Sequence, residues 1–347
     1  MRRTLIAILL LIAAWGVSGQ GKRMAVTALS EVQFREMPSY TAELGTQALM
    51  GTVVEIIAEE SYWRQVVTPE PYTAWCNELG LVEMTAEQIN EYKAAPKYIC
   101  LAHHSAVFNG TSFNSGRICD LSMGCLVRKV LIESKKGEKA SADKKGWVEV
   151  MLPDGRKGWT PAADLADFQE WADKTRQSES GIINTAKEFL GVPYLWGGTS
   201  SKGLDCSGLV RLTWMMNGYL LPRNAGQQAA LGREIIMEAD HSVTPDSDML
   251  YKEMLCRTRN LKPGDLIFFG TPETFWKKES ITHVGIYIGE GRFIHASQLV
   301  RINSLVPGEK DYYPNSYKLL KARRLFDWKG EGMTAIKKSP AYFLQNQ

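Results

Sequence analysis

The sequence predicts a multidomain chain in which two small all-β units precede a larger α+β unit. Short β-branched and aromatic segments separated by turn residues run from about residue 26 to residue 167. Beyond residue 167, segments with helical spacing alternate with strand patterns. With 347 residues, of which 44% are hydrophobic and 23% charged, the chain is long enough for two or three domains with ordinary packed cores.

The first twenty residues have the pattern of a secretory signal peptide. Two arginines precede an apolar run from Leu5 to Trp15, and small residues follow at 17–19. The run is shorter than the roughly 20 residues that span a bilayer. We therefore expect residues 1–19 to be removed on export. The remaining protein is expected to be soluble and periplasmic or secreted, without stable membrane insertion.

The repeated order of strands predicts the two all-β units. Residues 51–57 and 62–67 read as an apolar strand and a Trp-containing strand joined by a polar turn. The same order recurs at residues 129–132 and 146–150, and a further aromatic segment with a tryptophan follows in both units. Two copies of a unit of about 70 residues explain this pattern economically. The order resembles bacterial SH3-like barrels, which we expect at residues 24–96 and 97–168.

Charge and cysteine content exclude several classes of function. The net charge of +3, from 41 basic and 38 acidic residues, is too small to indicate a nucleic-acid partner. Six cysteines in a chain of this length do not make a disulfide scaffold, so buried thiols or one structural bridge are expected. One group of cysteines and histidines suggests a zinc site: Cys100, His103, His104, Cys119 and Cys125. Its spacing matches no standard pattern of zinc ligands. We therefore expect neither a metal nor a cofactor.

The α+β unit begins with helical spacing from Phe168 to Phe189, weakly interrupted at residues 177–179. A second helix is predicted after Asp205, a good N-cap residue, and it ends near residues 217–218. Cys206 then lies in the first turn, where unpaired N–H groups and the helix dipole favour a thiolate. A thiolate is the form that attacks a carbonyl carbon, although a lone cysteine in this place is more often a packing residue.

Two histidines lie on one predicted hairpin, whose strands start near Ile281 and Arg292. A two-residue loop would put His283 and His295 on opposite faces. A three-residue loop at residues 289–291, with a left-handed Gly291, would put them on the same face as diagonal neighbours. The second arrangement suits a base, His283, whose ring is held by a second polar residue, His295.

Several segments resemble the motifs of NlpC/P60 peptidases. They are LDCSGLV at 204–210, LKPGDL at 261–266, THVGIY at 282–287 and the lead-in PYLWGG at 193–198. The resemblance covers about residues 181–324 and implies a papain-like catalytic domain, expected at 169–347. It implies Cys206 as nucleophile, His283 as base and His295 as orienting residue. The backbone N–H of Cys206 is then a candidate for the oxyanion hole.

Two SH3-like units before such a domain resemble the layout of γ-D-glutamyl-L-diamino acid endopeptidases, also called dipeptidyl-peptidase VI. That resemblance implies a thiol protease that degrades and recycles short murein peptides with a free N-terminal L-Ala. The bond cut joins γ-D-Glu to meso-diaminopimelate or L-Lys. The resemblance also implies that a Glu and a Tyr of the first SH3-like unit bind the amino group, and Glu43 and Tyr72 match by position.

Other substrate contacts follow from the same resemblance. Asp205 and Ser207 match residues that contact the substrate, and Tyr194 and Trp196 match aromatic residues that line the cleft. The residues alone allow a simpler interpretation, in which Asp205 is only a helix cap and Trp196 packs in the core.

Asn224 departs from the family pattern. Asn224 and Ala225 follow Arg223 at the position where the pattern carries an acid and a hydroxyl. An amide oxygen accepts a hydrogen bond from an ammonium group but lacks the charge-assisted part. Asn224 remains a candidate substrate contact, and Glu43 is expected to be the remaining charged partner of the amine.

Three other functions are compatible with these motifs. The chain could be an endopeptidase on intact peptidoglycan, with the SH3-like units binding the wall, or a non-catalytic wall-binding protein. The same fold could also support an acyltransferase or amidase, because thiol chemistry alone does not name the acceptor. The leading expectation is a monomer that takes a murein peptide as its substrate.

Overall fold

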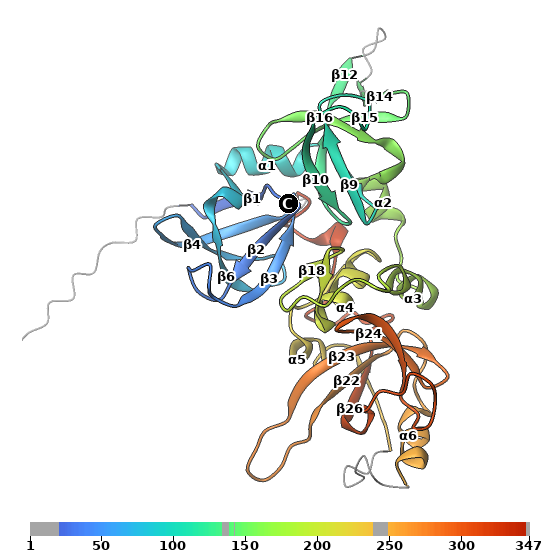
Figure 1. Ribbon diagram of the computed structural model, residues 1–347. Coiled ribbons are helices and arrows are strands. Elements are labelled where there is room, and N and C mark those ends of the chain that lie inside the picture. The colour runs from blue at the N-terminus through green and yellow to red at the C-terminus, as the bar shows by residue number, and fades with distance from the viewer. Residues whose placement is uncertain (1–20, 134–138, 142, 239–248, 345–347) are drawn as a thin grey trace, which may run out of the picture.

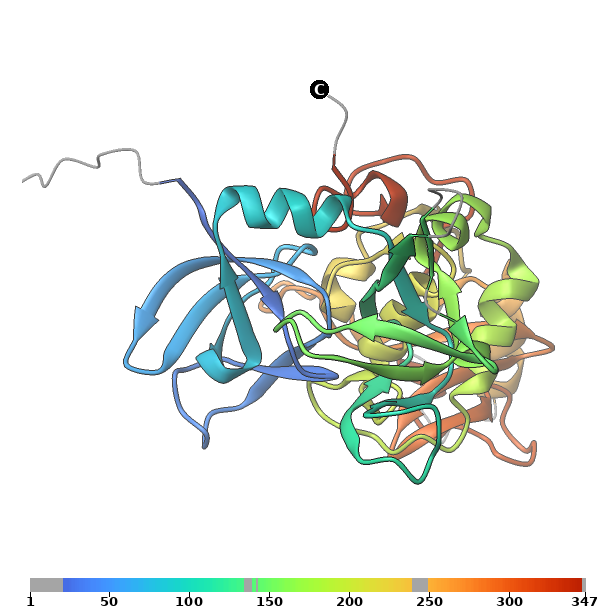
Figure 2. The same cartoon turned by 90° about the horizontal axis from the view of Figure 1, so that it is seen from above.

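The computed structural model describes residues 21–133, 139–141, 143–238 and 249–344. The predicted signal peptide lies outside these residues. Three sheets dominate the fold (Figure 1). The first sheet, in blue, lies beside the second, in green. The third sheet, in orange, lies at the end of the molecule away from the second. Figure 2 shows the first two sheets side by side, with the C-terminal part against them.

The first sheet has seven antiparallel strands in the order β3-β2-β6-β5-β4-β1-β7. They are β1 (Arg23–Thr27), β2 (Glu31–Arg35), β3 (Leu44–Leu49), β4 (Val53–Glu60), β5 (Trp63–Val67), β6 (Thr73–Asn77) and β7 (Leu81–Met84). Helix α1 (Ala86–Ala94) follows, and Thr85 caps it with a capping box that includes Gln88. Alternating side chains of β2 enter the core, where Val32 and Phe34 are buried.

The second sheet has the strand order β10-β9-β16-β15-β11-β8-β17, with β14 paired to β15. Its strands are β8 (Lys97–Cys100), β9 (His104–Phe108), β10 (Arg117–Ser122), β11 (Leu126–Lys129), β14 (Asp143–Lys144), β15 (Trp147–Met151), β16 (Lys157–Pro161) and β17 (Leu165–Asp167). A short pair, β12 (Leu131–Glu133) and β13 (Lys139–Ser141), stands apart. The two seven-strand orders match position by position, so the predicted repeat is present in the topology. Closure of either sheet into an SH3-like barrel stays a prediction.

The C-terminal part mixes helices with a six-stranded antiparallel sheet of order β21-β26-β22-β23-β24-β25. The helices are α2 (Phe168–Lys174), α3 (Glu179–Glu188), α4 (Cys206–Met215), α5 (Ala225–Gln228) and α6 (Leu250–Thr258). The sheet contains β21 (Arg233–Ile235), β22 (Leu266–Thr271), β23 (Ser280–Gly289), β24 (Arg292–Ser297), β25 (Leu299–Ser304) and β26 (Leu319–Arg324). Two small pairs complete it: β18 (Thr199–Ser200) with β19 (Gly203–Leu204), and β20 (Tyr219–Leu220) with β27 (Thr334–Ala335). The predicted helix boundaries at 177–179 and after Asp205 are confirmed.

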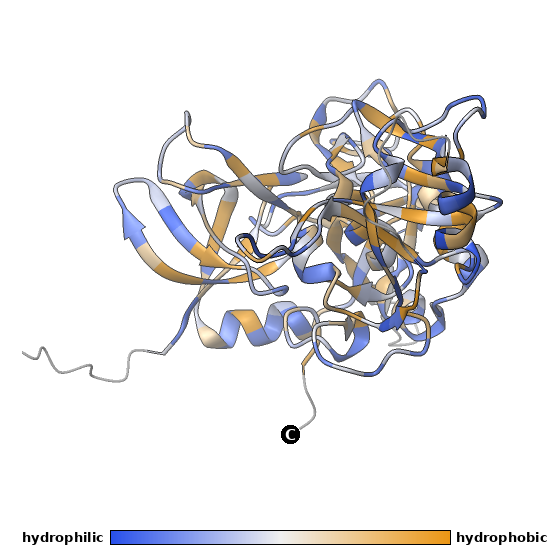
Figure 3. Cartoon of the chain, turned by 90° about the horizontal axis from the view of Figure 1, so that it is seen from below, coloured by the Kyte–Doolittle hydropathy of each residue, from blue (hydrophilic) through white to orange (hydrophobic). Residues whose placement is uncertain are grey.

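The hydrophobic core runs without interruption from the second sheet into the C-terminal part. One cluster joins Leu126 and Val150 of the second sheet to Leu209 and Val210 of helix α4. Hydropathy colouring shows apolar stretches along many of the strands, whereas apolar and hydrophilic residues alternate along the helices (Figure 3). The C-terminal segment also returns to this junction, where Phe343 stacks on Phe168 with the ring planes 9° apart. No helix within the described ranges is both long and apolar enough to cross a membrane.

Candidate active site

Cys206 lies at the start of helix α4, as the sequence predicts. The side chain of Asp205 caps the helix by accepting a hydrogen bond from the Gly208 N–H at 2.7 Å. Helix α4 packs on β23, and the Cys206 side chain is nearly buried, with 8% of the residue exposed. A side chain at position 208 would collide with the carbonyl oxygen of Gly198, so glycine permits the preceding loop to pass close to the first turn.

Asp205 is also part of a buried ion pair with Arg223. The Nη1 atom of Arg223 donates to Asp205 Oδ1 at 3.2 Å and to Ser207 Oγ at 2.9 Å, and Nη2 also bonds the carboxylate. The Gly197 N–H donates to the other carboxylate oxygen at 3.0 Å. Asp205 therefore forms hydrogen bonds with three segments: the glycine-rich loop at Gly197, the first turn of α4 at Gly208 and the segment that contains Arg223.

His283 and His295 are in direct contact. The His283 Nε2 and His295 Nδ1 atoms are 2.7 Å apart, and His295 Nε2 lies 2.8 Å from Asn303 Oδ1 on the next strand. The ring of Tyr313 stacks on His283 with centroids 6.0 Å apart and meets His295 edge-on. The predicted geometry of the two histidines is confirmed, while their catalytic roles stay predictions.

The hairpin reaches this register in a way that differs from the predicted three-residue loop. Gly289 pairs with Arg292, so the turn is the two-residue one at Glu290 and Gly291, with φ values of 52° and 70°. Positive φ at both positions is what a type I′ turn requires. A bulge at residue 288 shifts the ladder by one residue, so that Ile286 faces Ile294. The bulge brings the two histidines to the same face, which the turn alone would not do.

The protonation state of the site is neutral rather than ionic. Burial, together with the negative charge of Asp205, raises the pKa of the Cys206 thiol to about 11. Burial, with a smaller contribution from His295, lowers the pKa of His283 to about 3. Burial likewise lowers the pKa of His295 to about 4. The burial of Cys206 therefore opposes the thiolate that the helix start favours, because loss of solvation and the Asp205 charge together outweigh the backbone N–H contacts and Arg223.

A cavity of about 430 Å³ opens beside Cys206. Its lining includes Cys206 and every substrate-contacting residue that the sequence predicted: Glu43, Tyr72, Tyr194, Trp196, Asp205, Ser207 and Asn224. The structure thus brings residues from the first sheet and the C-terminal part to one place. Trp196 is 60% exposed, so its alternative interpretation as a core residue is wrong. Asn224 precedes α5, and its backbone N–H donates to Gln227 Oε1 at 3.1 Å.

The first sheet contributes an acidic wall to this cavity. The Tyr72 hydroxyl donates to Glu36 Oε1 at 2.5 Å, and Glu43 lies on the same wall. Burial and the neighbouring Glu36 raise the pKa of Tyr72, which keeps its hydroxyl protonated as a donor. The cavity end formed by the first sheet is therefore suited to a cationic group.

Hydrogen bonds hold this wall against the loop that leads to Cys206. Gln47 of β3 accepts the Thr199 N–H at 2.9 Å through its side chain and the Thr199 hydroxyl at 3.0 Å through its carbonyl oxygen. Lys202 donates to Ser30 Oγ at 3.0 Å and Glu31 Oε2 at 2.9 Å, and it pairs with Asp120 of the second sheet. Both N-terminal sheets thus contact the segment just before Cys206.

Sequence reasoning missed several residues of this site. Glu36 has no local signal, because only the fold brings it to Tyr72. Arg223 stands in a segment whose departure from the family pattern was noted, but its pairing with Asp205 spans 18 positions. Asn303 could have been found from β25. Arg301 pairs with His295, and Asn303, two positions further along the strand, has its side chain on the same face.

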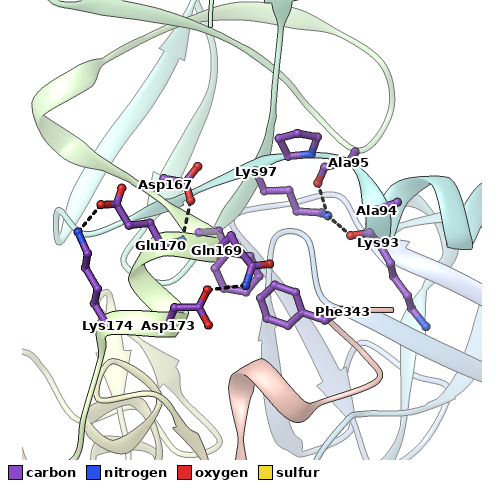
Figure 4. A pocket seen from close by; sticks show the side chains of 12 residues that line it. Lys93, Ala94, Ala95, Lys97, Asp167, Gln169, Glu170, Asp173, Lys174 and Phe343 are labelled. Atoms are coloured by element: carbon purple, nitrogen blue, oxygen red, sulfur yellow. Dashed lines mark hydrogen bonds and ion pairs between the residues drawn. The ribbon is translucent and has the colours of Figure 1, made fainter. Parts of the chain in front are cut away.

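A second cavity, of about 680 Å³, lies between α1, α2 and the C-terminal segment. Figure 4 shows Lys97 there, its Nζ donating to the carbonyl oxygens of Lys93 and Ala95, with Phe343 beside it. Its lining residues include neither a cysteine nor a histidine in the part of the chain that the structure describes. This cavity is larger than the one at Cys206, but its described lining residues provide neither a thiol nor an imidazole.

Comparison with known proteins gives a consistent assignment. The model of the NlpC/P60 family matches residues 191–319. A γ-D-glutamyl-L-lysine dipeptidyl-peptidase from Bacillus cereus is 28% identical over 79% of this chain and 74% of its own length. Dipeptidyl-peptidase 6 from Lysinibacillus sphaericus is 25% identical over 77% of this chain and 86% of its own.

A solved NlpC/P60 family protein from Bacillus cereus has a similar fold. The TM-score is 0.67 at 22% identity, and the match covers 87% of this chain and 99% of that one. The match extends well beyond the residues of the family domain and includes both N-terminal sheets. The domain match and the named relatives together identify residues 191–319 as a cysteine peptidase domain of the NlpC/P60 family, and the solved structure shows that the fold is shared over most of the chain.

Proposed function

We propose that this protein hydrolyses the bond between γ-D-Glu and the diamino acid, meso-diaminopimelate or L-Lys, in short murein peptides with a free N-terminal L-Ala. Two relatives support this reaction: one is a γ-D-glutamyl-L-lysine dipeptidyl-peptidase and the other a dipeptidyl-peptidase 6. The proposed role is degradation and recycling of wall peptides after export, in the periplasm or outside the cell.

The observation that carries the proposal is the acidic wall of the cavity beside Cys206. A volume of about 430 Å³ is near the lower end of the range of about 300–1,000 Å³ for small-ligand sites, so it suits a short peptide. Glu36, Glu43 and Tyr72 line this cavity, where a free ammonium group would gain charge-assisted hydrogen bonds. A peptide attached to a glycan strand has no N-terminal ammonium group, because the nitrogen of its L-Ala is part of an amide bond.

The proposed mechanism starts from a neutral thiol and a neutral imidazole. His283 takes the proton of Cys206 as the sulfur attacks the γ-carbonyl carbon, and the Cys206 N–H stabilises the oxyanion. The proton then passes to the leaving amine of the diamino acid as the C–N bond breaks, which leaves a thioester. Water gives a proton to His283, hydrolyses the thioester and releases the dipeptide with the thiol restored.

Glu36 changes the proposed recognition of the amine. The sequence left Glu43 as the only charged partner, because Asn224 replaces the acid of the family pattern. We propose that Glu36, held by Tyr72, supplies a second carboxylate and that Asn224 contributes an uncharged acceptor. Tyr194, Trp196, Asp205 and Ser207 are proposed to line the remaining peptide path.

We also propose the domain boundaries that the sequence predicts: signal peptide 1–19, SH3-like domains 24–96 and 97–168, and catalytic domain 169–347. The matching strand orders of the first two sheets support a duplication. The protein is proposed to act as a monomer, with the first SH3-like domain restricting the cleft to free peptides.

The test is to incubate the mature protein with L-Ala-γ-D-Glu-meso-diaminopimelate and to detect L-Ala-γ-D-Glu by mass spectrometry. Cys206→Ala and His283→Ala are expected to abolish release of the dipeptide. An N-acetylated tripeptide is expected to be a poor substrate. Equal cleavage of the acetylated peptide would refute amine recognition, and efficient cleavage of purified sacculi would favour an endopeptidase on intact peptidoglycan. Activity that survives Cys206→Ala would exclude the mechanism.

A further inference from the structure

Asn303 lies behind the two histidines, on strand β25. Its Oδ1 atom is 2.8 Å from His295 Nε2, and its Nδ2 atom donates to the carbonyl oxygen of Asp311 at 2.5 Å. Both Asn303 and His295 are buried, with exposed fractions of 7% and 0%. Asn303 therefore has one partner on each side and little access to water.

The chemistry of the Asp311 carbonyl determines which way the amide faces. A backbone carbonyl oxygen only accepts hydrogen bonds, so the amide NH₂ group must point toward it. The oxygen of the amide is then left facing His295. Asp311 has a left-handed backbone with φ of 63°, and the Ser304 N–H also donates to its carbonyl oxygen, at 3.0 Å. The loop that contains Asp311 is thus tied to β25 by two hydrogen bonds.

The orientation of the Asn303 amide determines which ring nitrogen carries the proton in His295 and in His283. An amide oxygen only accepts, so His295 must carry a proton on Nε2. A neutral imidazole has one N–H, and His295 Nδ1 is therefore an acceptor, which receives the Nε2–H of His283. The remaining nitrogen of His283, Nδ1, is left with a free lone pair.

We infer that Asn303 is a positioning residue that selects the tautomer of His283 and leaves Nδ1 as its basic atom. In this row, His283 donates to His295, His295 donates to the Asn303 amide oxygen, and the Asn303 amide NH₂ donates to the Asp311 carbonyl oxygen, which only accepts. The consequence for catalysis rests on the proposed function, in which His283 takes the proton of Cys206. The tautomer itself does not depend on that function.

Because both histidines are buried, it matters which of them donates the hydrogen bond that joins the two rings. Both histidines are neutral at physiological pH, because burial lowers the pKa of His283 to about 3 and that of His295 to about 4. Two neutral rings joined by one hydrogen bond have two possible polarities, and only one of them leaves Nδ1 of His283 unprotonated. Without Asn303, the His295 Nε2–H would be a buried donor without an acceptor, which favours the reverse polarity.

Long-range ¹⁵N–¹H NMR on protein labelled at histidine tests the inference directly, because the chain has five histidines and the two neutral tautomers give different patterns. At pH 7 we expect Nε2–H signals and unprotonated Nδ1 signals for both His283 and His295. Asn303→Leu is expected to convert His283 wholly or partly to the Nδ1–H form. Asn303→Asp keeps an oxygen opposite His295 and is expected to retain the original tautomer.

Asn217→Leu is the matched control. Asn217 is also buried in the C-terminal part, and its amide donates to Thr185 Oγ1 at 3.0 Å and to the Thr213 carbonyl oxygen at 2.9 Å, away from the histidines. It is expected to lower stability without changing either tautomer. Asn303→Leu is expected to lower kcat by about tenfold or more with KM nearly unchanged, since a general base contributes about 10²–10⁴-fold.

Two results would overturn the inference. One is an Nδ1–H tautomer of His283 in the unmodified protein. The other is an Asn303→Leu variant in which both tautomers are unchanged. If the tautomer changes as expected but no peptidase activity is found in any variant, the proposed function fails while the positioning role stands.

Discussion

Arg223→Met tests how the start of helix α4 is held. The side chains of Arg223 and Asp205 are 3% and 9% exposed, so the substitution removes one member of a buried ion pair and keeps most of the apolar volume. Such a change costs about 3–5 kcal/mol of folding free energy. Asp205 keeps hydrogen bonds from the Gly197 and Gly208 N–H groups at 3.0 and 2.7 Å. We therefore expect the free energy of unfolding to decrease by about 3 kcal/mol.

Asp205→Asn provides the second arm of a double-mutant cycle. Asparagine is also a good N-cap, so the bond to Gly208 survives while the negative charge is lost and Arg223 stays buried without it. We expect this variant to lose a similar amount. The double variant contains neither charge, and its loss is expected to be at least about 2 kcal/mol smaller than the sum of the two single losses.

The assay is urea denaturation at pH 7, followed by fluorescence and circular dichroism for the parent and the three variants. Both single variants are also expected to lose peptidase activity, because the first turn carries Cys206. Additivity within about 0.5 kcal/mol would show that the two groups do not interact energetically and would refute the reasoning.

Three further predictions concern pH and the amine-binding wall. Because the pKa values of His283 and His295 are lowered by burial to about 3 and about 4, the folded protein resists protonation, and stability is expected to fall as the pH drops from about 6.5 toward 3. His283→Gln is expected to reduce that fall between pH 7 and 4.5, and an unchanged pH dependence in urea denaturation would contradict it. Gly45→Ala places a Cβ atom against Glu36 and 2.6 Å from the Tyr72 hydroxyl, so KM for the free tripeptide is expected to rise severalfold while the thermal midpoint changes little. An unaltered KM would place the amine elsewhere. Asn224→Asp adds a carboxylate to the cavity and is expected to raise the ratio of kcat/KM for free over N-acetylated tripeptide by about tenfold, whereas a constant ratio would remove residue 224 from amine recognition.

The repeat and the helices could be recognised from the sequence because their signals are local, and the prediction of Cys206 as nucleophile rests on the same kind of signal. Asp205 and the spacing after Cys206 predict the helix start, and the structure has that start at the same residue. The Trp-containing strands predicted the two units, although neither the full set of strands nor closure into barrels follows from that pattern. Turn residues and side-chain alternation act over a few positions, so they can be identified without knowledge of distant contacts.

The tertiary structure decided the contacts that complete the site. The bulge at residue 288, not the length of the turn, brings His283 and His295 together. Burial raises the pKa of the Cys206 thiol and lowers that of the His283 imidazole, which opposes the thiolate that the helix start favours. Glu36 and Arg223 acquired partners 36 and 18 positions away, because a polar group that loses contact with water must be paired wherever the fold places it. The sequence by itself therefore determined the helix that begins at Cys206, whereas the packing of the three sheets determined the burial of the site and its acidic wall.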